Sequence, residues 1–175
     1  MVEKAKQFDR KAQGDLYQLY FKAMFNTSLR IVSDSYLAED IMQDSFIDGF
    51  RRISSLEDSS SFGAWMKKIV VNNSINQINR TGLISEKLEE VDFEQLAEPK
   101  EDFEVEVNEV KSAMKSLTKQ YQVIFSLYLI EGYDHEEIGE ILNISSSTSR
   151  SQLSRAKQRV RTIIEQNRQV YEVSR

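Results

Sequence analysis

The segment 134–161 constrains most strongly what this chain can fold into. It reads DHEEIGEIL, then NIS, then a basic stretch that runs through Arg161. Asp134 with Glu137 three residues later is typical of a capping box, and Ser145 is a natural N-cap for a second helix. Two helices joined by so tight a turn predict a helix-turn-helix, a motif whose second helix enters the major groove of DNA.

The second helix of this segment divides into two faces at about 100° per residue. One face is apolar and suits packing, whereas the other is small, polar and cationic. The residues predicted to contact DNA from this helix are Ser147, Thr148, Arg150, Ser151, Ser154, Arg155 and Lys157. Arginine can bind a guanine edge with two hydrogen bonds, and small hydroxyl residues let the helix lie deep in the groove. A solvated basic face is the alternative, but the capped turn favours DNA binding.

The distribution of charge supports this prediction, although the formal net charge is −5. Between residues 143 and 168 there are six basic residues and one acid, whereas between 84 and 109 there are eleven acids and two lysines. Charge separated in this way predicts regions with opposite tasks, one of them suited to a polyanion.

The chain is predicted to be all-α, with two small helical domains joined by an acidic linker. Six glycines and one proline are few helix breakers for 175 residues, and apolar residues recur every three or four positions. Helices in the first domain are predicted over 16–31, 38–53 and 62–80. The domains are predicted to span 1–80 and 109–175, the second containing the helix-turn-helix. The linker 81–108 has scattered apolar residues and contains Pro99.

Several kinds of chemistry are not expected. The absence of cysteine excludes disulfides, thiolate catalysis and cysteine zinc sites. His135 is the only histidine and lies beside two glutamates, so it is predicted to be a surface residue and not a ligand. No catalytic residue, metal site or cofactor is predicted. No apolar run approaches a membrane span and the N-terminus is no signal peptide, so we expect no membrane insertion and a cytoplasmic protein.

Three segments together resemble a known family. Residues 38–46, AEDIMQDSF, are similar to its A-E-D-hydrophobic-x-Q-[DE]-x-F helix, and residues 62–72, FGAWMKKIVVN, to its F-x-A-W-L-x-x-I-A-x-N helix. Residues 137–156 are similar to E-I-A-E-x-L-G-I-S-x-x-T-V-x-S-x-L-x-R-A. The chain thus resembles the extracytoplasmic-function (ECF) sigma factors of the sigma-70 superfamily. It departs from their pattern at Asn76, Gly139 and Ser149, where aspartate, alanine and a packing valine are usual.

The resemblance implies a sigma factor that binds core RNA polymerase, recognises a promoter and opens it, while the polymerase does the chemistry. Region 2, over 1–80, would bind core polymerase and the −10 element. Region 4, over 109–175, would bind the −35 element. The implied partners are the large subunits of core polymerase, promoter DNA and an anti-sigma factor. A stand-alone helix-turn-helix regulator is the rival prediction, and a helical scaffold is a third; neither explains residues 38–46 and 62–72.

An acidic edge is predicted on the helix 38–53. Its members are Asp40, Gln43 and Asp44, which share one face through three- and four-residue spacing. The spacing alone is also compatible with a solvated face. The resemblance implies that this edge docks on the clamp helices of the polymerase large subunit, where acids and amides pair with basic groups.

The following loop and helix combine hydroxyls, aromatic rings, lysines and an amide. The residues predicted to bind the −10 element are Leu56, Ser59, Ser60, Ser61, Phe62, Trp65, Lys67, Lys68 and Asn72. Such a mixture can hold an unstacked base of melted DNA. The resemblance implies that Asn72 and the serine loop capture a flipped base; for Trp65, core packing is favoured over stacking. It also implies that the acidic linker threads the RNA path of the polymerase, although charged linkers are usually just solvated.

Overall fold

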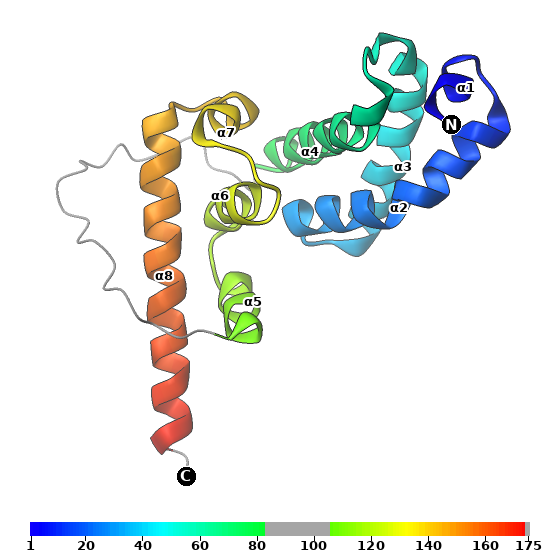
Figure 1. Cartoon of the computed structure of the whole chain (residues 1–175). Coiled ribbons are helices and arrows are strands. Elements are labelled where there is room, and N and C mark those ends of the chain that lie inside the picture. Colours follow the sequence, from blue (N-terminus) through cyan, green and yellow to red (C-terminus); the bar gives the residue numbers. More distant parts are fainter. Residues whose placement is uncertain (83–105, 174–175) are drawn as a thin grey trace. The chain divides into compact units, whose positions relative to one another are not determined.

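The computed structural model describes residues 1–82 and 106–173, and the regular elements in these ranges are all helical (Figure 1). This confirms the all-α prediction. The chain divides into two compact units, residues 1–82 and 83–175, which are described separately below. The predictions for residues 83–105, which include Pro99 and most of the acidic linker, lie outside the described residues.

The first unit is built around three long helices. Its elements are α1 (Val2–Lys6), α2 (Arg10–Val32), α3 (Ser35–Arg52), the 3₁₀ turns η1 (Ile53–Ser55) and η2 (Ser59–Ser61), and α4 (Phe62–Arg80). Helix α2 begins before the predicted residue 16, because the Asp9 side chain accepts a hydrogen bond from the Ala12 N–H at 3.0 Å and caps it there. The short helix α1 was not predicted.

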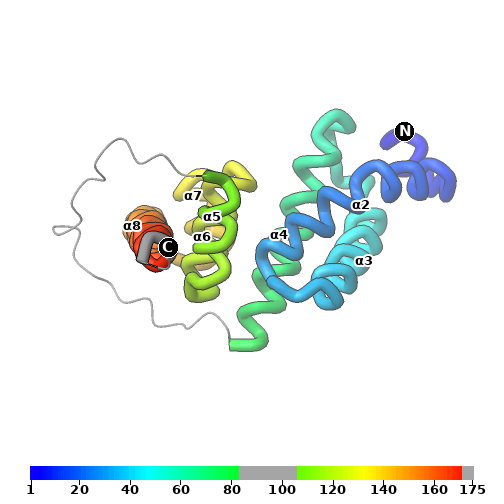
Figure 2. The backbone as a smooth tube through the Cα atoms, turned by 90° about the horizontal axis from the view of Figure 1, so that it is seen from below, coloured from blue at the N-terminus to red at the C-terminus, as the bar shows by residue number. Residues whose placement is uncertain are grey.

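A left-handed residue and a cap make the turn between α2 and α3. Ser33 ends α2 with φ 61°, and Asp34 then caps α3 by accepting from the Leu37 N–H at 3.0 Å. The chain therefore reverses over two residues, and α2, α3 and α4 pack side by side (Figure 2).

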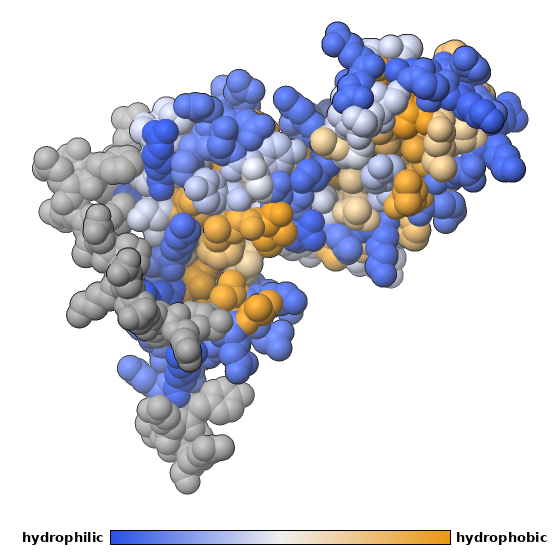
Figure 3. All heavy atoms as spheres, in the orientation of Figure 1, coloured by the Kyte–Doolittle hydropathy of each residue, from blue (hydrophilic) through white to orange (hydrophobic). Residues whose placement is uncertain are grey.

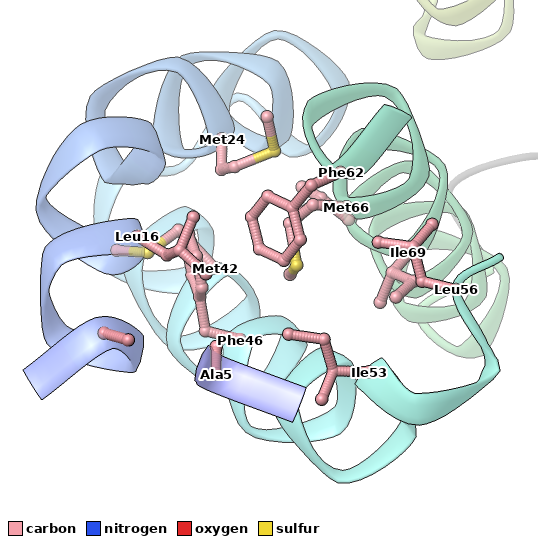
Figure 4. Packing of buried hydrophobic residues seen from close by; sticks show 12 residues of the cluster. Ala5, Leu16, Met24, Met42, Phe46, Ile53, Leu56, Phe62, Met66 and Ile69 are labelled. Carbon is pink, nitrogen blue, oxygen red and sulfur yellow. The ribbon is translucent and has the colours of Figure 1, made fainter. Parts of the chain in front are cut away.

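Apolar side chains from every helix of this unit meet in one core (Figure 4). Phe62 is 1% exposed and Met66 is completely buried at the start of α4. Helices α3 and α4 approach closely at Gly49, where an added Cβ would lie 2.8 Å from the Met66 sulfur. The periodic apolar residues predicted for α3 form its buried face.

The second unit is organised along one long helix. Its described elements are α5 (Val107–Lys115), α6 (Lys119–Leu129), α7 (His135–Leu142) and α8 (Ser146–Val173). Helices α5, α6 and α7 each pack against α8 (Figures 1 and 2). Helix α8 continues beyond the basic stretch that ends at Arg161, because no glycine or proline interrupts it and Ile163 and Ile164 continue its apolar side.

An ion pair joins the two ends of this unit's sequence. The Arg168 guanidinium donates to both carboxylate oxygens of Glu109, at 2.8 and 2.7 Å, and so fixes the start of α5 to the late part of α8. Hydrogen bonding from Arg168 lowers the pKa of Glu109 to about 2. Since the pKa in the folded state lies below the ordinary value, the stabilisation is complete above about pH 4.5 and is lost as the pH falls toward 2.

We therefore expect Arg168→Ala to lower the unfolding temperature more at pH 7 than near pH 2.5. Arg168→Lys should lower the unfolding temperature less than Arg168→Ala, because lysine keeps the positive charge but cannot make the bidentate pair of hydrogen bonds. Thermal unfolding followed by circular dichroism at both pH values measures the difference. Equal losses at the two pH values would show that Arg168 acts through packing alone.

Candidate nucleic-acid and polymerase interfaces

The first helix of the helix-turn-helix, α7, begins with the predicted capping box. The Asp134 carboxylate accepts from the Glu136 and Glu137 N–H groups at 2.8 Å each, and Glu137 accepts from the Asp134 N–H at 2.9 Å. Asn143, with φ 55°, ends α7 in the left-handed conformation. The turn then passes close to Gly139, where a Cβ would lie 2.8 Å from the Ile144 carbonyl oxygen. This close approach leaves no room for a Cβ at position 139 unless the turn shifts.

Ser145 caps the second helix, as predicted. Its Oγ accepts from the Thr148 N–H at 3.0 Å and lies 2.8 and 2.7 Å from the hydroxyls of Ser147 and Thr148. Ser147 is exposed and Thr148 is half-buried. The first turn of α8 thus gathers three hydroxyls at the end of the helix that favours a phosphate.

A polar pair replaces the expected valine packing between α7 and α8. Ser149 is completely buried, and its Oγ lies 2.9 Å from Nδ1 of His135. The imidazole of His135 stacks on the Tyr128 ring, with 4.7 Å between centroids. Burial, and then the charge of Arg150, lower the pKa of His135 below its usual value, which favours the neutral ring. His135 is half-buried, so it lies near the surface but has both a polar and an aromatic partner.

We expect His135→Ala to destabilise the second unit by about 1–3 kcal/mol, because it leaves a buried hydroxyl without its partner. Adding Ser149→Ala should recover part of this loss, since removing both polar groups is less costly than removing one. Denaturant unfolding of the two single variants and the double variant measures the coupling. Additive effects would mean that the contact contributes nothing of its own.

The predicted DNA-reading face of α8 is largely accessible. Arg150 and Lys157 are exposed, and Ser154 and Arg155 are half-buried. The Lys157 ammonium also lies over the Tyr128 ring, 5.7 Å from its centroid. This contact orients the Lys157 side chain of α8 toward α6.

Ser151 does not belong to this accessible face. The residue is only 9% exposed, and its hydroxyl donates to the Thr148 carbonyl oxygen at 3.0 Å. Helical spacing gives the direction in which the Ser151 side chain points, but whether that side chain is exposed depends on what packs around the helix.

The predicted acidic edge lies on the exposed side of α3. Asp40, Gln43 and Asp44 are all exposed. Two large apolar side chains that sequence reasoning missed lie on the same helix: Tyr36 is 84% exposed and Ile47 is 50% exposed. Their spacing from Asp40 and Gln43, four residues in each case, was the available signal.

The serine loop is organised by an aspartate that was not predicted. Asp58 accepts from the Ser60 N–H at 2.8 Å and from the Ser60 hydroxyl at 2.6 Å. The Ser61 hydroxyl donates to the Asp58 carbonyl oxygen at 2.7 Å. The Ser59 hydroxyl donates to the carboxylate of Glu3, in α1. All three serines thus have defined partners within the first unit.

Two residues predicted to contact −10 DNA lie in the core instead. Leu56 is 5% exposed and Phe62 is 1% exposed, and both belong to the cluster of Figure 4. Buried in this way, the two side chains present little surface to a ligand. Trp65 is half-buried and packs against the same cluster, with its ring 6.0 Å from that of Phe62.

The exposed side of α4 is rich in amides. Lys68, Asn72 and Asn76 are exposed at four-residue spacing, and Lys67 is half-buried. Asn76, with Arg80, also lines a polar groove between α3 and α4 that reaches Asp44. Asn72 is therefore available to a ligand, as its prediction requires.

Two family models match most of the chain. Residues 16–83 match Sigma-70 region 2, and residues 108–160 match Sigma-70, region 4. The match contains both of the first-unit motifs and the helix-turn-helix. The chain belongs to the ECF sigma factors of the sigma-70 family.

Relatives of this sigma factor cover almost its whole length. It is 28% identical to the ECF RNA polymerase sigma factor SigM of Bacillus subtilis over 85% of this chain and 93% of that protein. It is 26% identical to an ECF RNA polymerase sigma-E factor of Haemophilus influenzae over 94% of each chain. The fold is similar to that of the sigma factor RpoE from Bartonella quintana, solved with the anti-sigma factor NepR. The TM-score is 0.58 and the identity 22%, over 89% of this chain and 98% of that one.

Membership of this family settles the class of function. Sigma factors direct RNA polymerase to promoters and are not themselves enzymes. The stand-alone regulator is therefore excluded, since it leaves the region 2 match without a role. Among residues 1–82 and 106–173, no helix is long and apolar enough to span a bilayer. Those residues also contain no group of three or more acids or histidines able to hold a metal ion.

Proposed function

We propose that this sigma factor docks on core polymerase through the α3 edge formed by Asp40, Gln43 and Asp44. The carboxylates are exposed and can pair with basic groups on the polymerase. Tyr36 and Ile47 add exposed apolar area on the same helix, before and after these residues along α3, which a protein partner can bury. The combination of exposed acids and exposed large apolar side chains carries this assignment.

For the −10 element, the proposed contacts are the serine loop and the exposed side of α4. Ser59, Ser60, Ser61 and Asn72 supply polar atoms for the edge of a flipped base. Lys67 and Lys68 supply charge for the phosphates, and Trp65 supports the site from the core side. An unpaired base has donors and acceptors that duplex DNA hides, so hydroxyls and an amide at accessible positions suit its capture.

For the −35 element, the proposed reader is the first half of α8. Ser147 and Thr148 lie at the helix N-terminus, where phosphate binds favourably. Ser154, Arg155 and Lys157 follow, and Arg150 is the exposed arginine nearest the start of the helix. The capped turn, which fixes α8 against α7, supports its use as a recognition helix.

Replacing Arg150 or Arg155 with alanine should weaken −35 binding by about 1–3 kcal/mol if the arginine binds a guanine through two hydrogen bonds, and should relax preference at one base. Arg159→Ala is the matched control, because Arg159 is exposed and lies on the opposite side of α8 from Arg150. Binding of holoenzyme to a set of single-base −35 variants measures both effects. Uniform weakening across the set would reassign the arginine to a phosphate.

A protein partner is also proposed for the second unit. Val107 is 68% exposed, Leu129 47% and Ile130 48%, and Figure 3 shows hydrophobic residues gathered over α5 and α6. Such a surface suits either the polymerase or an anti-sigma factor, and the latter is the proposed regulator. We infer a cytoplasmic location, since the polymerase is found there.

Transcription reconstituted with core polymerase tests the proposal. The purified chain, core enzyme and a genomic promoter library should yield transcripts with a common pair of upstream elements. Core enzyme alone should yield none of them. Binding of the chain to duplex DNA without polymerase, together with failure to associate with core enzyme, would overturn the proposal.

A further inference from the structure

The short helix α1 is fixed to the core of the first unit and holds the serine loop. Ala5 is completely buried in the core, where Figure 4 shows it beside Phe46 and Ile53. The Gln13 amide donates to the Ala5 carbonyl oxygen at 3.3 Å, which ties α1 to α2. The carboxylate of Glu3, on this anchored helix, accepts a hydrogen bond from the Ser59 hydroxyl. A segment outside the region 2 match thus touches the proposed −10 site.

Two carboxylates therefore set the direction of the loop's hydroxyl protons. Ser59 donates to Glu3, and Ser60 donates to Asp58 at 2.6 Å. The bond from Ser59 lowers the pKa of Glu3 and the bond from Ser60 lowers the pKa of Asp58, so both acids are ionised at neutral pH. Hydrogen bonds to an ionised carboxylate are about twice as strong as neutral ones. A serine has a single proton, so each of these Oγ atoms offers only lone pairs to a ligand.

We propose that Glu3 and Asp58 make the serine loop a set of hydrogen-bond acceptors, so that it selects a base with an exocyclic amino group. Adenine, cytosine and guanine carry such a group, and thymine does not. Thymine offers a single donor, N3–H, between two carbonyl oxygens, and these oxygens would meet hydroxyl lone pairs and lose their water without gaining donors. The Asn72 amide has both a donor and an acceptor, so it does not distinguish thymine from bases that carry an amino group. The inference rests on the proposed capture of a base by this loop.

Base analogues test the chemistry directly. Open complexes formed by holoenzyme are selected from promoters randomised across the melted element, which identifies the position that depends on Ser59 and Ser60. At that position thymine should be disfavoured about tenfold. Replacing adenine with purine, which lacks only the amino group, should cost a similar factor, as should replacing cytosine with uracil. Equal use of adenine and purine would overturn the inference.

Variants of Glu3 test the role of α1. Glu3→Ala frees the Ser59 proton and should raise the use of thymine at the captured position, while Ser60, held by Asp58, keeps part of the preference. Glu3→Gln keeps a carbonyl oxygen that can accept, and should retain the preference. Lys6→Ala is the control, because Lys6 contacts Glu3 at 3.1 Å but has no bond to the loop. Glu3 is exposed and Lys6 half-buried on α1, and neither belongs to the core, so thermal unfolding should change little. Unchanged base preference in folded Glu3→Ala would contradict the role of α1.

Replacing both loop serines distinguishes a wrong acceptor model from a wrong base-capture site. If Ser59→Ala with Ser60→Ala opens every promoter as the parent does, the loop captures no base and the proposed site is wrong. If the double variant opens promoters poorly while the parent accepts thymine as well as adenine, the site stands and only the acceptor model is lost.

Discussion

Replacing Asp40 and Asp44 with lysine is expected to weaken binding to core RNA polymerase by about 100-fold. Exposed acids that meet basic groups lose an attraction when reversed and gain a repulsion, and like charges brought together cost several kcal/mol. The fold should persist, because both residues are exposed on α3 and its buried face is untouched. Affinity for core enzyme, measured by fluorescence anisotropy of labelled protein at two salt concentrations, gives the result.

The control for this experiment is Asp15→Lys, which reverses an exposed acid on α2. It should leave the affinity for core polymerase nearly unchanged. The single changes Asp40→Lys and Asp44→Lys should each account for part of the loss. A correctly folded double variant that binds core polymerase as tightly as the parent would remove the acidic edge from the docking surface.

Asn72→Ala is expected to lower open-complex formation by about 10- to 100-fold while core binding and −35 recognition persist. Flipping a base costs a few kcal/mol, which contacts in the pocket must return. The substitution removes both a donor and an acceptor from an exposed position of α4. A permanganate footprint of the melted region on matched promoters measures the defect.

Two comparisons make this experiment specific. The defect should shrink on a template with a pre-melted bubble, because the unpairing cost is already met there. Asn26→Ala removes the same amide from an exposed position of α2 and should open promoters normally. If Asn72→Ala matches the parent on duplex promoters, Asn72 is only a surface residue and the base must be held elsewhere.

The helix-turn-helix shows where local sequence is sufficient. Asp134, Glu137 and Ser145 act on N–H groups within three residues of themselves, so their types and spacing predicted the caps that the structure contains. The exposure of the acidic edge of α3 could also be predicted from local sequence, because the buried and exposed sides of the helix alternate at the helical period. Family resemblance then supplied the function that these local patterns leave open.

Other features depended on parts of the chain that are distant in sequence. Leu56 and Phe62 appeared suited to a DNA surface, but the core formed by α1, α2 and α3 covers them. His135 appeared isolated until α8 brought Ser149 to within 2.9 Å of it. The Glu3–Ser59 bond spans 56 residues, a separation at which no local pattern operates. Sequence by itself determined the long helices, the caps of the helix-turn-helix and the apolar side of each long helix, because those depend on neighbours a few residues away. Only the tertiary structure decided which presented side chains reach solvent and which polar groups find partners, because burial and long-range hydrogen bonds depend on how the helices pack.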